Sequence, residues 1–299
     1  MKVKKFFSIA AALAALVSCT GNKDLEPVRD SLFLCLSCKP YPTKAADPDP
    51  VLISDYNILV YNCFNVLEYY EYVPEREAAM EVVHSVELLR GQPCTILAAA
   101  NLGYPLGALS WEEAMSFRHY LAYPDQYSHG IPMAAIRHGT ADGARIDVRL
   151  ERLMAAVDVY IDKSGLDADV NLNVKEICVG NCPRAVKPFS PGRAMEFFPS
   201  GFSKSGRELY PLDRGEAVRL YLLENLAGEN PSSYIEIKSS YRSTTLHNKA
   251  GESLVYRFRL GQEGEYNIGR NTLFKVVVRP TGDGLSQGDS WRIDTSGLE

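Results

Sequence analysis

The fold class is decided by residues 145–162, which read RIDVRLERLMAAVDVYID. Apolar residues recur with a period of two in both halves of this stretch, at Ile146, Val148, Leu150, Val157, Val159 and Ile161. Successive side chains of a β-strand point to opposite faces, so the period predicts two half-buried strands in succession. A helix would bring apolar residues back every three or four positions instead. The stretch is therefore typical of an all-β protein.

The same pattern recurs on both sides of this stretch. Further strands are predicted at residues 31–38, 55–65, 67–73, 85–90, 94–100, 170–179, 218–223, 234–241, 254–260 and 273–278. Glycine, proline and asparagine turns separate them, as in β-sandwiches. We expect two β-sandwich domains, residues 31–164 and 165–299, with their joint at Gly165–Ala168.

One short helix is predicted in the first domain. Ser110 can cap its start, and Glu113 stands three residues later, which is the spacing of a capping box. Helical spacing of apolar residues continues from Trp111 to Ala122. In the second domain, Gly201–Gly206 is predicted to be a loop.

The first nineteen residues carry the features of an export signal. Three lysines precede the apolar run Phe6–Val17, which is shorter than the ~20 residues that cross a bilayer. The residues Leu-Val-Ser before Cys19 resemble a bacterial lipobox, which implies acylation of Cys19 on sulfur and on nitrogen. An ordinary signal peptide with a chance cysteine is the alternative. We expect residues 1–18 to be removed and residues 19–30 to form a lipidated tether.

Composition argues against nucleic-acid binding. The net charge of −5 becomes −8 when residues 1–18 leave with three lysines and no acidic residue (−5 − 3), whereas nucleic-acid binders are basic. Six cysteines follow Cys19: Cys35, Cys38, Cys63, Cys94, Cys178 and Cys182. Strand periodicity places Cys35 and Cys38 on opposite faces, so we expect no metal site and no cofactor. Most of these cysteines are expected to pack as small apolar residues, with disulfide pairing left open.

No catalytic constellation is found in the sequence. A phosphate-binding loop, a dinucleotide motif and a nucleophile elbow are all missing, and the five histidines are scattered. We therefore predict that the protein is not an enzyme. His119 and His129 flank a segment with Tyr120, Tyr123 and Tyr127. These tyrosines could form a platform for sugars, or simply pack within a loop.

A series of motifs follows the lipobox in a definite order. They are Ser54–Asn62 (SDYNILVYN), Leu88–Asn101 (LLRGQPCTILAAAN), Gly130–Met133 (GIPM), Ile146–Val157 (IDVRLERLMAAV) and Arg270–Phe274 (RNTLF). Their order and spacing resemble the fimbrillin family, the type V pilins of anaerobic gut and oral bacteria. The similarity extends from about residue 31 to residue 278 and is weaker in the second half.

The resemblance implies a surface function. Fimbrillins are lipoproteins of the outer membrane built from two transthyretin-like β-sandwiches. In this chain, the one short helix would belong to the first of the two sandwiches. Removal of their first strand opens a groove that a strand of the next subunit fills. Here that strand would be Ser31–Cys38, with Leu32, Leu34 and Leu36 filling the pockets. The implied partners are other fimbrial subunits, the outer membrane through the lipid, and a host or bacterial surface receptor.

The resemblance also implies a cleavage site and a donor segment. Cleavage would fall in the proline-rich segment Lys39–Pro50, and the donor would come from Leu273–Val278 and Ser290–Asp294. A fixed edge strand with a short tail is the alternative for this donor region. Stalk subunits of the family are typically cut after arginine, but Lys44 is the candidate in this segment. A subunit that stays uncut would be an anchor or accessory protein. A surface lipoprotein that binds glycans in a polysaccharide-uptake system is the alternative function.

Overall fold

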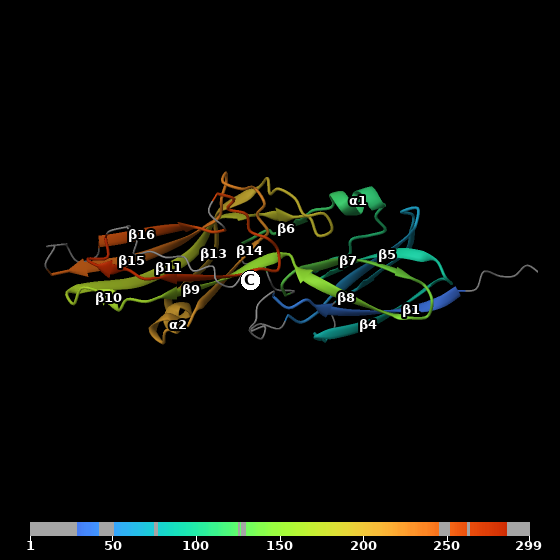
Figure 1. The fold of residues 1–299 in the computed structure, drawn as a ribbon, viewed down its shortest axis with the longest axis horizontal. Coiled ribbons are helices and arrows are strands. Elements are labelled where there is room, and N and C mark those ends of the chain that lie inside the picture. The colour runs from blue at the N-terminus through green and yellow to red at the C-terminus, as the bar shows by residue number, and fades with distance from the viewer. Residues whose placement is uncertain are drawn as a thin grey trace, which may run out of the picture.

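Two β-sandwiches lie end to end along the longest axis of the molecule (Figure 1). The computed structural model describes residues 29–41, 51–74, 77–124, 126, 130–244, 252–261 and 264–285. Within these ranges no helix has the length and apolar character needed to cross a membrane. The all-β prediction is confirmed.

The first sandwich is a bent seven-stranded sheet in the order β3-β2-β5-β7-β8-β1-β4. Its strands are β1 (Arg29–Cys38), β2 (Tyr56–Asn62), β3 (Leu67–Val73), β4 (Glu81–Leu89), β5 (Pro93–Ala100), β7 (Met133–Thr140) and β8 (Arg145–Arg152). The pairs Met133–Arg152 and Ala134–Glu151 join β7 to β8. Both halves of the sheet bury side chains in one core, which includes Leu34 of β1 and Ile58 of β2. The sheet therefore folds over on itself around that core.

Strand β5 is buried on both faces, as its continuous apolar sequence predicts. Ile96 and Ala98 belong to the core of the first sandwich, whereas Leu97 and Ala99 pack outside it. Helix α1 (Trp111–Ser116) contributes Ala114 to this outer layer. The helix thus covers the second face of the sheet.

The second sandwich has a three-stranded and a four-stranded sheet, in the orders β14-β9-β17 and β13-β11-β15-β16. Its strands are β9 (Met154–Ile161), β11 (Val170–Pro183), β13 (Phe197–Ser205), β14 (Val218–Leu223), β15 (Tyr234–Ser243), β16 (Glu252–Arg259) and β17 (Leu273–Val278). Side chains from both sheets form its core.

The pairing of β9 differs from the domain division expected at residue 164. Strand β9 pairs with β14 and β17, and Val157 and Val159 are buried in the second core. The chain therefore passes between the sandwiches at Leu153, between β8 and β9. The expected joint at Gly165 instead lies in β10 (Gly165–Leu166), which pairs with β18 (Thr281–Gly282).

The capping box of α1 is confirmed, but the helix is shorter than its sequence pattern predicts. Ser110 accepts a hydrogen bond from the Glu113 amide, and the Glu113 carboxylate accepts one from the Ser110 amide. The helix ends at Ser116, and β6 (His119–Tyr120) pairs with β12 (Ala185–Val186). The helical spacing of apolar residues continues to Ala122, but the pairing of β6 with β12 prevents the helix from extending that far.

Two further elements differ from the sequence expectations. The predicted loop at Gly201–Gly206 lies largely in β13, which pairs with β11 through Ser203, Lys204 and Ser205. A 3₁₀ turn, η1 (Gly206–Leu209), follows directly and leads into α2 (Tyr210–Asp213). The second sandwich therefore also contains a short helix.

Candidate functional site: the groove of the first strand

The first strand lies inside the sheet rather than at its edge. β1 pairs antiparallel with β4 from Arg29–Leu89 to Ser37–Glu81, and parallel with β8 from Phe33–Arg145 to Cys38–Leu150. From Phe33 to Ser37, β1 therefore has a paired strand on each side. Without β1, the facing backbone groups of β4 and β8 would lose their partners, and such groups are a template for another strand.

The inner face of β1 is apolar from Leu32 to Leu36. Leu32, Leu34 and Leu36 are fully buried in the core of the first sandwich, whereas Phe33 on the outer face is 42% exposed. Burial of one leucine side chain contributes about 1.5–3 kcal/mol, so the three together contribute on the order of 5–9 kcal/mol. The alternation expected from the sequence is therefore present, and the three leucines are part of the core of the first sandwich.

The chain leaves β1 through a polar site at the junction of the two sandwiches. The Lys39 amide donates to the Leu150 carbonyl at 2.7 Å, and the Lys39 carbonyl accepts from the Arg152 guanidinium at 2.9 Å. The Pro40 carbonyl accepts from the side-chain amide of Asn271 at 3.1 Å. The Tyr41 ring lies 4.0 Å from the Arg152 guanidinium carbon. Sequence reasoning missed Arg152 and Asn271 because neither type signals binding by itself.

The predicted donor strand is built into the second sandwich. β17 pairs parallel with β9, and Phe274, Val276 and Val278 are buried in the second core. The second part of the predicted donor, Ser290–Asp294, lies outside the described residues, as do Cys19 and Lys44.

The motif Arg270–Phe274 ties the loop before β17 to the junction. The Arg270 guanidinium binds both carboxylate oxygens of Glu224 at 2.9 Å and donates to the carbonyls of Lys187 and Pro188 at 2.8 Å. The Glu224 side chain is buried, and that of Arg270 is 10% exposed. This ion pair accounts for the arginine of the motif, and the next residue, Asn271, contacts the exit of β1.

Tyrosine hydroxyls lie beside the two buried histidines of the first domain, His84 and His119. The Tyr104 hydroxyl lies 2.8 Å from His119 Nδ1, and the two rings are stacked. Burial lowers the pKa of His119 to about 4. His84 lies between the hydroxyls of Tyr56 and Tyr69, and burial lowers its pKa as well. Both histidines are therefore held neutral near pH 7.

The predicted tyrosine platform is only partly within the described residues. Tyr120 is half-exposed and donates to Glu196, and Tyr123 is 67% exposed. Tyr127 and His129 lie outside the described residues. The sugar-binding alternative thus rests on Tyr120 and Tyr123.

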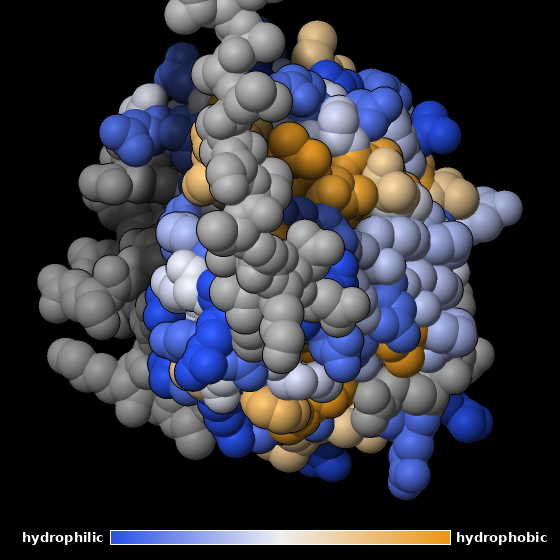
Figure 2. Space-filling view, turned by 90° about the vertical axis from the view of Figure 1, so that its right-hand side faces the viewer, coloured by the Kyte–Doolittle hydropathy of each residue, from blue (hydrophilic) through white to orange (hydrophobic). Residues whose placement is uncertain are grey.

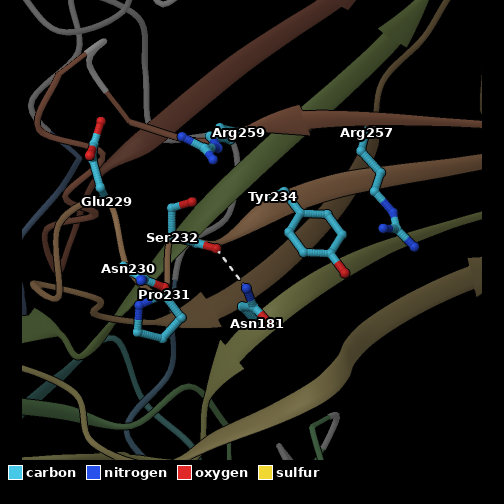
Figure 3. A pocket seen from close by; sticks show the side chains of 8 residues that line it. All are labelled: Asn181, Glu229, Asn230, Pro231, Ser232, Tyr234, Arg257 and Arg259. Carbon is cyan, nitrogen blue, oxygen red and sulfur yellow. Dashed lines mark hydrogen bonds between the residues drawn. The ribbon is translucent and has the colours of Figure 1, made fainter.

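A hollow of about 310 Å³ opens beside β15 and β16 (Figure 3). The Asn181 side chain donates to the Ser232 carbonyl there, at 3.0 Å. The Tyr234 ring packs so closely on Gly180 that an added Cβ would lie 2.1 Å from it, and the Arg257 guanidinium lies 5.4 Å from the ring centre. An aromatic ring that covers a cross-strand glycine stabilises a sheet. The ring is therefore engaged by the protein itself, which argues against a sugar platform.

The six cysteines after Cys19 are present as free thiols. Cys63 is exposed and Cys38 is partly buried, and the other four are buried. Burial raises the pKa of the Cys35, Cys94, Cys178 and Cys182 thiols. Across the described ranges, no cluster of three or more His, Cys, Asp or Glu side chains could hold a metal ion.

Apolar side chains are exposed where the first sandwich ends. Figure 2 looks onto the end that faces away from the second sandwich and shows apolar surface there. Phe64 and Val66, in the turn between β2 and β3, are 80% and 57% exposed. Large exposed apolar side chains of this kind are typical of contact surfaces.

Comparisons with known proteins show the fold of the chain. No protein-family model matches the sequence. No curated protein matches it either. Among solved structures, a candidate cell adhesion protein of Parabacteroides distasonis is 14% identical with a TM-score of 0.65, over 89% of this chain and 91% of that one.

Two fimbrial proteins of Porphyromonas gingivalis share the same architecture. A fimbrilin (FimA) is 14% identical with a TM-score of 0.59, over 85% of this chain and 91% of that one. The tip fimbrial protein Mfa3 is 12% identical with a TM-score of 0.56, over 83% of this chain and 95% of that one. The resemblance to fimbrillins read from the sequence is therefore confirmed at the level of the fold.

Proposed function

We propose that this chain is a structural subunit of a cell-surface fimbria, joined to its neighbours by exchange of a β-strand and supporting adhesion. The observation that carries the proposal is the position of β1. This strand pairs with β4 and β8 on its two sides, and its three leucines fill the core of the first sandwich. The fold shared with fimbrial and adhesion proteins supports the same function.

Export as a lipoprotein is part of the proposal. The sequence before Cys19 has the charge and length of a signal peptide and ends in a lipobox-like motif. Two or three acyl chains on Cys19 would hold the precursor stably on the outer membrane, since each buried methylene contributes about 0.8 kcal/mol. Lys23, Asp24 and Glu26 resemble the surface-export signal of such lipoproteins.

Strand exchange requires that β1 be released from the rest of the chain. We propose that a surface protease cuts the segment Lys39–Pro50 at Lys44, so that β1 can leave with the lipid. An extended segment of the next subunit then pairs with β4 and β8 and inserts alternate apolar side chains into the groove. Residues Ser290–Asp294 carry Trp291 and Ile293 at this alternate spacing and are the proposed donor.

The proposal assigns the chain no catalytic role and no cofactor. His84 and His119 are engaged by tyrosines in the interior of the first domain. The structural neighbours with the same fold are fimbrial and adhesion proteins rather than enzymes.

A disulfide that locks β1 in place tests the proposal. Cys35 faces Val83 across the β1–β4 ladder, and facing Cβ atoms of antiparallel strands lie close enough for a disulfide when the pair is not hydrogen-bonded. Val83→Cys should therefore link β1 to β4 under oxidation. We expect the oxidised variant to remain monomeric and the reduced variant to assemble into fimbriae.

Val83→Ser is the matched control, because it places a small side chain at the same exposed position but cannot form a disulfide with Cys35. Fimbriae are scored by electron microscopy and by oligomer ladders on unheated gels. Peptide mapping must show that Cys35 is bonded to the cysteine introduced on β4. If the bonded variant assembles as well as the reduced one, β1 does not leave during assembly and the proposal is wrong.

A further inference from the structure

The exit of β1 is held by side chains that come from both sandwiches. Arg152 ends β8 in the first sandwich, and Asn271 precedes β17 in the second. The two side chains bind one another, since Arg152 Nη1 donates to Asn271 Oδ1 at 2.9 Å. We call Arg152 and Asn271 together the exit site. It binds three consecutive residues, Lys39, Pro40 and Tyr41.

The exit site is buried and specific in what it contacts. Arg152 is fully buried, and Asn271 and Tyr41 are each less than one-tenth exposed. Arg152 and Asn271 donate to the carbonyls of residues 39 and 40, and the Tyr41 ring covers the guanidinium. Two of the three contacts use backbone carbonyls, which any peptide can supply. The third requires an aromatic ring.

The exit site is anchored by elements that do not include β1. The Asn271 amide donates to the Met154 carbonyl, and Asn271 adopts a positive φ of 52°. Asparagine tolerates this conformation better than most residues. The preceding Arg270 is fixed by the buried carboxylate of Glu224. The loop is thus held in place by the second sandwich and would persist when β1 leaves.

Departure of β1 would leave the buried Arg152 charge without two of its contacts. A buried cation that loses hydrogen-bond partners is costly, so a replacement peptide that restores them binds better than one that does not. A hollow of about 320 Å³ adjoins the exit site, with Pro40, Val51 and Met80 among its lining residues.

We infer that the exit site selects the strand that replaces β1, by binding two consecutive backbone carbonyls and an aromatic side chain that follow the apolar part of that strand. This inference rests on the proposed strand exchange. In this chain Tyr41, which follows β1, stands five positions after Leu36, the last leucine of the inner face. The partner is thus an extended peptide with three alternating apolar residues and an aromatic residue at that distance. Ser290–Asp294 does not carry this pattern, so the inference concerns a strand from a different fimbrial subunit.

Competition between peptides tests the inference without altering the fold. The full chain carries a specific protease site in place of residues 43–47 and is cut there, so that β1 can exchange. Pairs of synthetic peptides in excess then compete for the cut protein, and native mass spectrometry measures the ratio bound. The peptides are residues 29–41, residues 29–38, and residues 29–41 with Tyr41→Ala or Tyr41→Phe.

We expect residues 29–41 to bind at least tenfold better than residues 29–38. Tyr41→Ala should lose at least fivefold, whereas Tyr41→Phe should stay within twofold, because phenylalanine keeps the ring face. The protein variant Asn271→Asp keeps the acceptor for Arg152 and tolerates positive φ but cannot donate to residue 40. It should reduce the preference for the longer peptide severalfold.

Equal binding of residues 29–41, residues 29–38 and the Tyr41→Ala peptide would overturn the inference and leave strand exchange standing. If neither length of peptide replaces β1, the proposed function fails and the exit-site inference fails with it. The peptide comparisons remain decisive even if Asn271→Asp does not fold, because they use the unaltered Arg152 and Asn271.

Discussion

Replacement of Leu34 by alanine probes how much β1 contributes to the first sandwich. Leu34 is fully buried at the middle of β1, where it faces His84 of β4 and Ile146 of β8. Truncation of a buried leucine to alanine costs 2–5 kcal/mol, because transfer free energy is lost and a cavity remains. With a urea m-value of about 2 kcal/mol per molar, the unfolding midpoint of the first sandwich should fall by about 1–2.5 M.

Trp111 offers a local probe for this experiment. It lies at the start of α1, with its ring 5.3 Å from that of Tyr61 in β2. The second tryptophan, Trp291, is replaced by phenylalanine so that fluorescence reports the first sandwich alone. Phe33→Ala is the matched control, since Phe33 is 42% exposed on the opposite face of the same strand.

The control should shift the midpoint by less than half as much as Leu34→Ala. Equal shifts for the two variants would mean that the inner face of β1 does not fill the groove. The account of β1 as an integral strand would then be refuted.

Three further outcomes follow from buried groups. Burial lowers the pKa of His119 to about 4, so protonation of His119 is less favourable in the folded protein than in the unfolded chain. The free energy of unfolding should therefore keep its full value above pH 6.5 and fall by about 2.5 kcal/mol by pH 4.5. Urea unfolding of His119→Gln should lack this loss. Glu224→Gln should cost about 3–5 kcal/mol, because Arg270 loses its only carboxylate partner among the described residues. Glu216→Gln, in an exposed ion pair, should cost under about 1 kcal/mol, and similar losses for the two variants would contradict the burial of the Glu224 pair. Of the six cysteines after Cys19, maleimide should label Cys63 fastest in the folded protein, and rapid labelling of the buried Cys182 would contradict the packing.

Local signals in the sequence predicted strands and the start of a helix well. Period-two alternation identified β1 and β8, since one face of each is buried and the other is not. Ser110 and Glu113 located the start of α1 because a capping box is a contact between near neighbours. The helix end was predicted too late, because β6 pairs with β12, about 65 residues further along the chain.

Contacts distant in sequence could not be predicted in this way. The alternation in β9 shows a strand but not which sheet it joins, so the boundary between the sandwiches was expected too late in the chain. Arg152 contacts Lys39 and Asn271 across 113 and 119 residues, and Asn271 contacts Pro40 across 231. A single sequence carries no signal for such pairs, so the groove was anticipated but the exit site was not.

The N-terminal residue of the subunit in assembled fimbriae tests the central claim most directly. Fimbriae are sheared from cells, and the intact mass and N-terminal sequence of the subunit are determined. The account predicts a chain that begins at Ala45, after cleavage at Lys44 and loss of β1. Assembled subunits that still begin at acylated Cys19 would retain β1 in its groove and would contradict strand exchange at this site.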